Sequence, residues 1–163
     1  MAIAEAMHNN GEIIATDIYK RKLRLITEQA HRLGVKIVKT WSWDASRVDS
    51  ELVDTADRVL VDAPCSGLGT VRKKPEIKYR EYDGKMENLP QIQKDILMAS
   101  SSYVKPGGIL VYSTCTISDR ENRQVSEAFL RIKKDFEHIE SKLLLPGKGE
   151  TDGFYICKMK RKD

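Results

Sequence analysis

Short apolar segments alternate along the chain with segments in which apolar residues recur every three or four positions. The short segments are rich in β-branched residues and are followed by polar or turn-forming residues, which is typical of buried strands. They predict strands at residues 11–16, 35–41, 58–61 and 109–112, with two more near 136–140 and 154–158. This alternation predicts a parallel sheet wrapped by helices, because parallel strands need a long crossover connection that is usually a helix.

Helices are predicted between these strands, each from a single apolar face. The first helix ends before Gly34, and the second ends before the Pro-Gly-Gly turn at 106–108. Ser118 and Glu121 have the spacing of a capping box and therefore predict the start of the third helix. The apolar faces consist of Leu23, Ile26, Ala30 and Leu33, of Ile92, Ile96, Ala99 and Tyr103, and of Val125, Ala128, Phe129 and Ile132.

The composition is that of a soluble globular chain the size of one domain. Of the 163 residues, 40% are hydrophobic and 32% are charged, which excludes collagen-like and low-complexity proteins. No apolar run approaches the ~20 residues of a membrane-spanning helix, and the N-terminus lacks the features of a secretory signal. We therefore expect a cytoplasmic protein with no membrane partner.

The cysteines, Cys65, Cys115 and Cys157, are odd in number and far apart in the sequence. This spacing provides neither a disulfide framework nor a metal-binding pair, so we expect free thiols and no metal. Free thiols most often serve as small buried hydrophobic residues, and Cys157, within a predicted strand, fits that role.

Residues capable of chemistry follow the predicted strands, and the carboxyl ends of parallel strands are where such sheets bind ligands. Asp17 and Asp44 follow the first two strands. A carboxylate in such a place accepts hydrogen bonds from ribose hydroxyls or from the amine of an adenine. Both residues are also explained as helix N-caps or ordinary loop carboxylates.

Cys65 and Cys115 follow the next two strands in the same way. If these strands are neighbours, the two thiols meet in one cleft although they are far apart in sequence. Their meeting is also explained by chance, or by an adventitious disulfide. Two features favour a functional pair: each cysteine lies on a tight turn, and Asp62 shares the turn of Cys65.

A thiol in such a cleft suits methyl transfer to a pyrimidine, whose C5 atom is not nucleophilic. Addition of a thiolate to C6 turns C5 into an enamine-like carbon that attacks an electrophilic methyl group. The adduct must then lose the C5 proton to a base, and an acid near N3 stabilises the charge that develops.

Four motifs surround and follow the two cysteines: Asp-Ala-Pro-Cys-Ser-Gly at 62–67, Pro-Gly-Gly-Ile-Leu-Val-Tyr-Ser-Thr-Cys-Thr at 106–116, Glu-Asn at 121–122 and Thr-Asp-Gly-Phe-Tyr at 151–155. With these motifs the sequence closely resembles the RsmB/Sun family of RNA cytosine-C5 methyltransferases, and looks closest to the bacterial members that modify 16S ribosomal RNA. The resemblance covers essentially the whole chain. It implies a Rossmann-like class I S-adenosylmethionine-dependent methyltransferase sheet flanked by helices, with S-adenosyl-L-methionine as cofactor and 16S rRNA as partner.

The resemblance also implies a role for each candidate residue. Cys115 is the nucleophile that attacks C6, and Cys65 helps to resolve the adduct and release the RNA. Asp62 contacts the N3/N4 edge of the cytosine and is counted with the cofactor-binding residues, while Asp17 and Asp44 bind the ribose and the adenine of the cofactor. The resemblance, and not the spacing, selects Cys115 over Cys65, since DNA cytosine methyltransferases use the Pro-Cys thiol.

The segment after Cys65 is basic and carries aromatic residues, within a chain whose net charge is +4. Such a pattern suits single-stranded RNA, whose phosphates pair with cations and whose bases stack on aromatic rings. A run of charge is also typical of a merely solvated loop. The alternative to an enzyme is a non-catalytic RNA-binding remnant that uses residues 72–80 alone. The predicted RNA-binding residues are Arg72, Lys73, Lys74, Lys78 and Arg80.

Members of the family carry a central strand and a Gly-rich cofactor loop before the strand that here ends at Asp17, and nothing in this sequence matches them. We therefore expect residues 1–163 to be a partial methyltransferase catalytic domain, truncated at the N-terminus so that the first strand and the Gly-rich loop are missing. The missing strand would leave unpaired edges, so we also expect the isolated chain to bind S-adenosylmethionine weakly.

Overall fold

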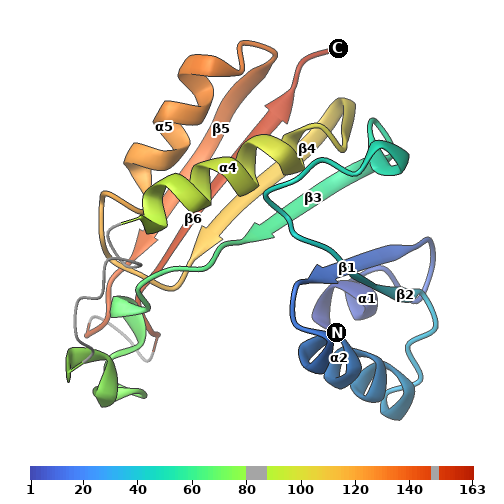
Figure 1. Cartoon of the computed structure of the whole chain (residues 1–163), viewed down its shortest axis with the longest axis horizontal. Coiled ribbons are helices and arrows are strands. Elements are labelled where there is room, and N and C mark those ends of the chain that lie inside the picture. The colour runs from blue at the N-terminus through green and yellow to red at the C-terminus, as the bar shows by residue number, and fades with distance from the viewer. Residues whose placement is uncertain (80–87, 148–150) are drawn as a thin grey trace. The chain divides into compact units, whose positions relative to one another are not determined.

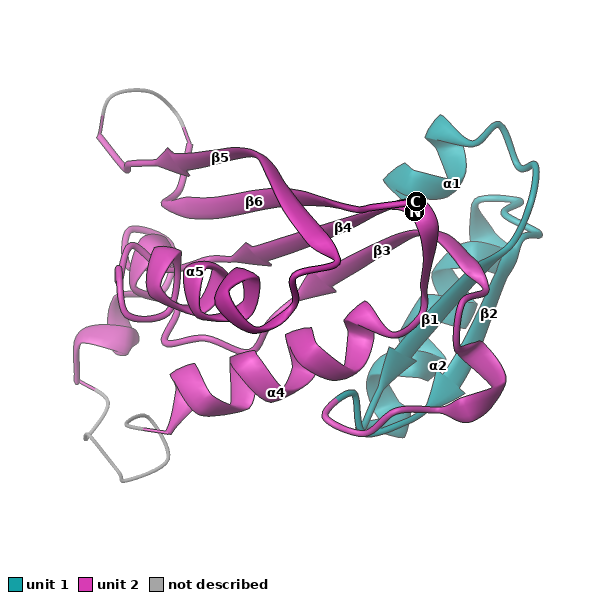
Figure 2. Ribbon diagram, turned by 90° about the horizontal axis from the view of Figure 1, so that it is seen from above, with its two compact units in different colours: residues 1–45 teal, residues 46–163 magenta. Residues whose placement is uncertain are grey.

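The computed structural model describes residues 1–79, 88–147 and 151–163 (Figure 1). The chain divides into two compact units, Met1–Ala45 and Ser46–Asp163, and each has a sheet of its own and is described by itself (Figure 2). No helix within these described ranges is both long and apolar enough to cross a membrane. The assignment of residues 1–163 to a single partial catalytic domain stays a prediction.

The first unit is a two-stranded parallel sheet with helices. Leu23 and Ala30 of the predicted helical face are buried, and Gly34 adopts a left-handed conformation (φ +67°) that ends the helix where the sequence predicted it. Asp17 lies opposite Ser42 in the parallel register, so both strands end at the same edge. The elements are α1 (Ala2–Ala6), β1 (Ile13–Asp17), α2 (Lys20–Arg32) and β2 (Val38–Ser42).

The second unit is a four-stranded sheet in the order β3-β4-β6-β5, with α4 and α5 on one face (Figures 1 and 2). The strands β3 and β4 are parallel, whereas β6 is antiparallel to both of its neighbours. Its elements are the short 3-10 helices η1 (Ser50–Leu52), η2 (Leu68–Thr70) and η3 (Pro75–Tyr79), the helices α4 (Leu89–Ser101) and α5 (Arg123–Ile132), and the strands β3 (Ala56–Asp62), β4 (Val104–Thr114), β5 (Phe136–Leu144) and β6 (Phe154–Arg161).

The prediction of a parallel sheet is wrong for the last two strands. Residues 145–153 separate β5 from β6, and this connection is too short for a helical crossover, so the two strands run antiparallel. In addition, β1 and β2 pair with each other in the described chain and do not join the sheet of the second unit. The predicted neighbourhood of β3 and β4 is confirmed.

The core of the second unit lies between its sheet and the two helices. Alternate residues of β4, among them Leu110, are fully buried against them. The buried face of α4 differs from the prediction by one residue: Gln93 and Leu97 are 0% exposed, whereas Ile92 and Ile96 are only half-buried. The Nε2 of Gln93 donates to two interior acceptors, which offsets part of the cost of burying this polar side chain, whereas its Oε1 has no hydrogen-bond partner among the described residues.

The predicted capping box is also wrong. The helix α5 begins at Arg123, with Asn122 at the N-cap and no side-chain cap hydrogen bond. Glu121 is buried, and its carboxylate accepts hydrogen bonds from Ser66, which lies 55 residues earlier in the chain. The Glu121 side chain therefore binds a residue distant in sequence and does not cap the helix start as the local pattern had predicted.

Candidate active site

Cys65 and Cys115 meet at the carboxyl ends of two adjacent parallel strands. Asp62 ends β3 and lies opposite Ser113 near the end of β4, so the loops that follow both strands start from the same edge. The two Sγ atoms are 3.3 Å apart, and both side chains are partly buried. The structure thus brings together the two thiols that the sequence predicted to meet.

The loop of Cys65 is held by hydrogen bonds on both sides of the cysteine. On one side, the amide of Gln93 donates to the carbonyl oxygen of Pro64 at 2.8 Å. On the other side, Ser66 donates twice to the carboxylate of Glu121, from its backbone N–H at 2.8 Å and from its hydroxyl at 2.6 Å. The backbone around Cys65 is therefore fixed by buried partners.

The loop of Cys115 is held in the same way, by Asn122. The hydroxyl of Thr114 donates to the side-chain oxygen of Asn122 at 2.5 Å, and the amide of Asn122 donates to the carbonyl oxygen of Thr116 at 2.9 Å. Asn122 is 2% exposed. One buried amide side chain thus binds the residues that flank Cys115.

Two glycines bring a third segment close to the cysteine loops. The N–H of Gly69 donates to the carbonyl oxygen of Cys115 at 3.0 Å, and the N–H of Gly153 donates to the carbonyl oxygen of Gly69 at 2.8 Å. A Cβ atom on Gly69 would lie 2.0 Å from the carbonyl oxygen of Gly153. Only glycine therefore allows the backbone before β6 to approach the site this closely.

The environment of Cys65 opposes ionisation. Burial raises the pKa of Cys65 above its ordinary value, and the hydrogen bond and charge of Cys115 raise it further. A thiol with a raised pKa keeps its proton at neutral pH. The raised pKa keeps the Cys65 thiol protonated well above neutral pH, and either sulfur atom can be the donor in the contact with Cys115.

The predicted acidic residues lie at strand ends in both units. In the second unit, Asp62 is exposed, and the hydroxyl of Ser113 donates to its carboxylate at 3.4 Å. In the first unit, Asp17 accepts from the N–H of Tyr19 at 2.8 Å and pairs with Lys22 at 3.0 Å. Asp44 is exposed two residues after β2.

The basic segment is exposed, with one cation anchored. Lys73 forms an ion pair at 2.7 Å with Asp152, whose side chain is only 8% exposed. The other oxygen of Asp152 is buried and has no hydrogen-bond partner within residues 1–79, 88–147 and 151–163. The exposed cations in the described part of this segment are Arg72, Lys73, Lys74 and Lys78, and the predicted Arg80 lies outside the described residues.

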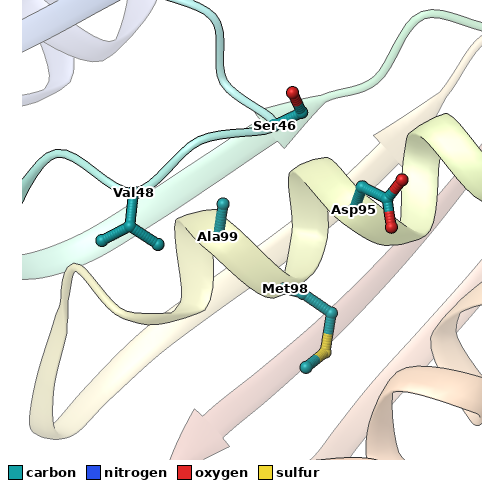
Figure 3. A pocket seen from close by; sticks show the side chains of 5 residues that line it. All are labelled: Ser46, Val48, Asp95, Met98 and Ala99. Carbon is teal, nitrogen blue, oxygen red and sulfur yellow. The ribbon is translucent and has the colours of Figure 1, made fainter.

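A shallow hollow of about 390 Å³ lies beside α4, lined by Ser46, Val48, Asp95, Met98 and Ala99 (Figure 3). None of these is a residue predicted to bind cofactor or RNA or to take part in catalysis. In residues 1–79, 88–147 and 151–163, no group of three or more His, Cys, Asp and Glu side chains is placed to hold a metal ion.

Sequence reasoning missed the polar residues that hold the cysteines: Ser66, Gln93, Thr116, Glu121 and Asn122. A usable signal was present for two of them, because Cys65 and Cys115 are each followed directly by a hydroxyl residue. Gln93 lies among the polar residues Gln91, Lys94 and Asp95, so its sequence context gives no such signal. The partners themselves lie far apart in sequence, so only the fold pairs them.

Known proteins resemble this chain over nearly its whole length. A model of the 16S rRNA methyltransferase RsmB/F family matches residues 1–160. The "probable ribosomal RNA small subunit methyltransferase B" of Bacillus subtilis is 40% identical over 178 residues, covering 98% of this chain and 40% of that protein.

Solved structures give the same result. The crystal structure of PH0851 has a TM-score of 0.92 and 32% identity, covering 97% of this chain and 39% of that one. NSun6 from Pyrococcus horikoshii, solved with SFG, has a TM-score of 0.82 and 32% identity, covering 99% and 44%.

The fold is thus the mixed α/β fold of class I S-adenosylmethionine-dependent methyltransferases. Within that class, the chain belongs to the 16S rRNA methyltransferase RsmB/F family, which confirms the predicted resemblance. It spans about 40% of the length of the curated relatives that it matches.

Proposed function

We propose that this chain carries the methyl-transfer site of an RNA cytosine-C5 methyltransferase that acts on 16S ribosomal RNA. The observation that carries the proposal is the 3.3 Å contact between the sulfur atoms of Cys65 and Cys115 at the ends of adjacent parallel strands. A surface that only binds RNA does not need two thiols fixed by buried hydrogen bonds. Membership of the family supports RNA as the substrate class.

In the proposed reaction, the thiolate of Cys115 adds to C6 of the cytosine and the electron pair of the C5–C6 double bond becomes available at C5. C5 would then form a bond to the methyl carbon as the bond from that carbon to the sulfonium sulfur of the donor breaks and the sulfur keeps the electron pair. A base removes the C5 proton, and the bond between Cys115 and C6 breaks to return the thiolate. Cys65 remains protonated because its pKa is raised by burial, so it does not compete for C6. We assign to it the resolution of the adduct and the release of the RNA.

Asp62 is assigned to the N3/N4 edge of the cytosine. Its carboxylate is exposed at the edge from which both cysteine loops start. A carboxylate accepts a hydrogen bond from the N4 amine, and in its protonated form it donates one to N3. Either contact would hold the base and stabilise the charge that develops on the ring.

The acidic residues fit the polar groups of S-adenosylmethionine, which supplies an electrophilic methyl group when bound. The Asp17 carboxylate already binds Tyr19 and Lys22, but each carboxylate oxygen has two lone pairs and the side chain is 23% exposed. It can therefore also accept hydrogen bonds from ribose hydroxyls. Asp44, exposed after the neighbouring strand, is assigned to the adenine amine, and Asp62 is included in the same set.

Contacts with the RNA backbone are assigned to the exposed basic segment. Arg72, Lys74 and Lys78 present cations to solvent, and Tyr79 is 83% exposed, so a ring is available for stacking. Lys73 is assigned to the same surface, although its ion pair with Asp152 also ties it to the protein.

The test is covalent trapping. The chain is incubated with an RNA oligomer of 16S sequence containing 5-azacytidine, whose adduct cannot eliminate because N5 carries no proton to lose. S-adenosylmethionine is added at a concentration high enough to saturate even the weak binding expected of this chain. Denaturing electrophoresis then detects protein bound covalently to RNA. Wild type and Cys65→Ser are expected to form the complex, and Cys115→Ser is expected not to. Cys157→Ser is the matched control, because Cys157 is fully buried in β6.

Each other result contradicts a defined part of the proposal. A complex that persists in Cys115→Ser and disappears in Cys65→Ser reverses the roles of the two thiols. RNA binding that weakens with salt but ignores both cysteines, with no covalent complex, favours the non-catalytic RNA-binding alternative. No complex and no RNA binding would exclude the proposed activity for this chain.

A further inference from the structure

A buried carboxylate connects the loops of the two cysteines. Glu121 is 6% exposed, and Ser66, Thr116 and Gln93 around it are 5%, 0% and 0% exposed. One of its oxygens accepts from the backbone N–H of Ser66 at 2.8 Å and from the amide of Gln93 at 3.0 Å. The other accepts from the hydroxyl of Ser66 at 2.6 Å.

The network continues from Ser66 to the second cysteine loop. The hydroxyls of Ser66 and Thr116 are 2.8 Å apart. Since the single hydroxyl proton of Ser66 is donated to Glu121, the hydroxyl of Thr116 must donate to Ser66. The residues that directly follow Cys65 and Cys115 are thus hydrogen-bonded to each other, and Glu121 fixes the direction of that bond.

The backbone of Glu121 adds a further anchor. Its carbonyl oxygen accepts from the hydroxyl of Tyr112 at 2.6 Å, and Tyr112 lies on β4 before Cys115. The amide of Gln93, which binds the Glu121 carboxylate, also binds Pro64 on the other side of Cys65. Both cysteine loops therefore depend on one side chain and its immediate neighbours.

A buried anion is costly unless its lone pairs are satisfied. Among the described residues, Glu121 takes part in no ion pair, and its carboxylate is compensated by donors from Ser66 and Gln93. Removing the carboxylate would leave these buried donors without an acceptor, so they would turn toward other partners and move the loops that carry them.

We propose that Glu121 is a positioning residue that sets the distance between the sulfur atoms of Cys65 and Cys115. It does not touch the reacting atoms, and its effect on methyl transfer rests on the proposed function. Its effect on the separation of the thiols does not.

The test therefore measures that separation chemically, through the rate at which the two cysteines form a disulfide with the oxidant diamide. The two thiols lose two protons and two electrons and join in an S–S bond, while the N=N bond of diamide gains them and becomes a hydrazine. Peptide mapping after alkylation identifies the bond between Cys65 and Cys115. The rate requires the sulfur atoms to approach each other, so it reports position directly.

The variants are Glu121→Ala, Glu121→Gln and Ser66→Ala, with Glu127→Gln as the matched control because Glu127 is exposed on α5. We expect Glu121→Ala to slow disulfide formation about tenfold or more, since small displacements of reacting groups have effects of this size. Glu121→Gln keeps an oxygen acceptor and is expected to restore much of the rate. Glu127→Gln is expected to match the wild type.

The rate at which the buried Cys157 is alkylated reports whether a variant loosens the whole fold. It therefore distinguishes a change in the positions of Cys65 and Cys115 from a general loss of structure. If Glu121 acts by positioning, disulfide formation falls while Cys157 stays protected. If Cys157 becomes reactive in Glu121→Ala, Glu121→Gln and Ser66→Ala alike, the role of Glu121 is purely structural and the proposal is overturned. Unchanged disulfide rates in all three variants would overturn it as well.

The covalent RNA complex supplies the link to function. Slower disulfide formation together with fewer trapped complexes in Glu121→Ala supports both proposals. If disulfide formation is slower in Glu121→Ala but even the wild type forms no covalent RNA complex, the positioning role of Glu121 is supported and the proposed function is rejected. An RNA complex that forms at the wild-type rate in a variant with slow disulfide formation limits Glu121 to the geometry of the thiols and excludes its effect on catalysis.

Discussion

The loops of the two cysteines and the basic segment that follows Cys65 are built in opposite ways. Around the cysteines, Ser66, Thr116 and Glu121 are buried and bind one another, so the sulfur atoms are held in place before any substrate arrives. In the basic segment, Arg72 and Lys74 are exposed to solvent. Thiols that react with a substrate must be held in a fixed position, because small displacements slow a reaction strongly. Cations that attract a flexible polyanion need only be exposed on side chains long enough to contact its phosphates.

The largest effect is expected from crowding the cysteine loops. Gly69→Ala places a Cβ 2.0 Å from the carbonyl oxygen of Gly153 and 2.8 Å from that of Cys115, and backbone cannot yield as a side chain can. We expect it to lower the free energy of unfolding by about 3 kcal/mol. Urea denaturation followed by circular dichroism measures the change.

Gly34→Ala is the control for the Gly69 variant. Gly34 has φ +67° and no atom within 4 Å of an added Cβ, so only the left-handed conformation is penalised, by about 1 kcal/mol. Equal losses in the two variants would show that the close approach at Gly69 does not strain the site.

A smaller effect is expected from alkaline pH. Burial raises the pKa values of Cys65 and Cys157, so the unfolded chain loses these protons at lower pH than the folded chain does. The contribution of these thiols to stability is therefore complete below the ordinary thiol pKa and falls as the pH rises above about 9. Urea midpoints between pH 7 and 10 measure this loss.

The double variant Cys65→Ser, Cys157→Ser is expected to flatten that pH profile, because serine does not ionise in this range. A slope unchanged by the double variant would mean that other groups, such as Tyr112 and Tyr155, whose pKa values are also raised by burial, cause the loss.

Lys73 and Lys74 are neighbours in the basic segment, and only Lys73 is paired with a buried carboxylate in the described structure. Substituting each in turn separates the effect of a buried ion pair from that of an exposed cation. Lys73→Ala leaves the Asp152 carboxylate buried at 8% exposure without its cation, so we expect a loss of about 1 kcal/mol in stability. Asp152→Asn in the same chain is expected to recover part of it. If Lys74→Ala destabilises the chain equally, the ion pair is not the cause.

The smallest effect is expected in RNA binding. Arg72→Ala and Lys74→Ala should each weaken binding a few-fold, and each should lower the slope of log K against log salt by about 1, because one phosphate contact is lost. Fluorescence anisotropy with a single-stranded RNA across a salt series measures both. Lys105→Ala, whose partner Asp57 lies on β3, is the control and should change neither value.

Most elements could be predicted from the sequence, because periodicity reports burial directly. The helix that ends before Gly34 and the strand β3 were predicted within a few residues of their bounds. The strand β4 begins at Val104, five residues before its predicted start, so the predicted Pro-Gly-Gly turn at 106–108 is wrong and these residues belong to the strand.

The buried face of α4 is shifted by one residue from the prediction, to Gln93 and Leu97. A hydrophobic pattern assigns a glutamine to the exposed face, whereas Gln93 is buried and donates a hydrogen bond to Glu121. The antiparallel direction of β6 depends on the length of the connection before it, which the alternation of elements does not report.

The amino-acid sequence alone was enough to predict the family, which is confirmed, and to propose the reactive groups: the two cysteines, the carboxylates near strand ends and the cations after Cys65. The way in which the cysteine loops are held could be read only from the folded chain. Glu121 has the local spacing of a helix cap, yet its carboxylate binds Ser66 across 55 residues of chain. A short-range pattern cannot report this, because the energy of a buried charge depends on which donors the fold brings to it.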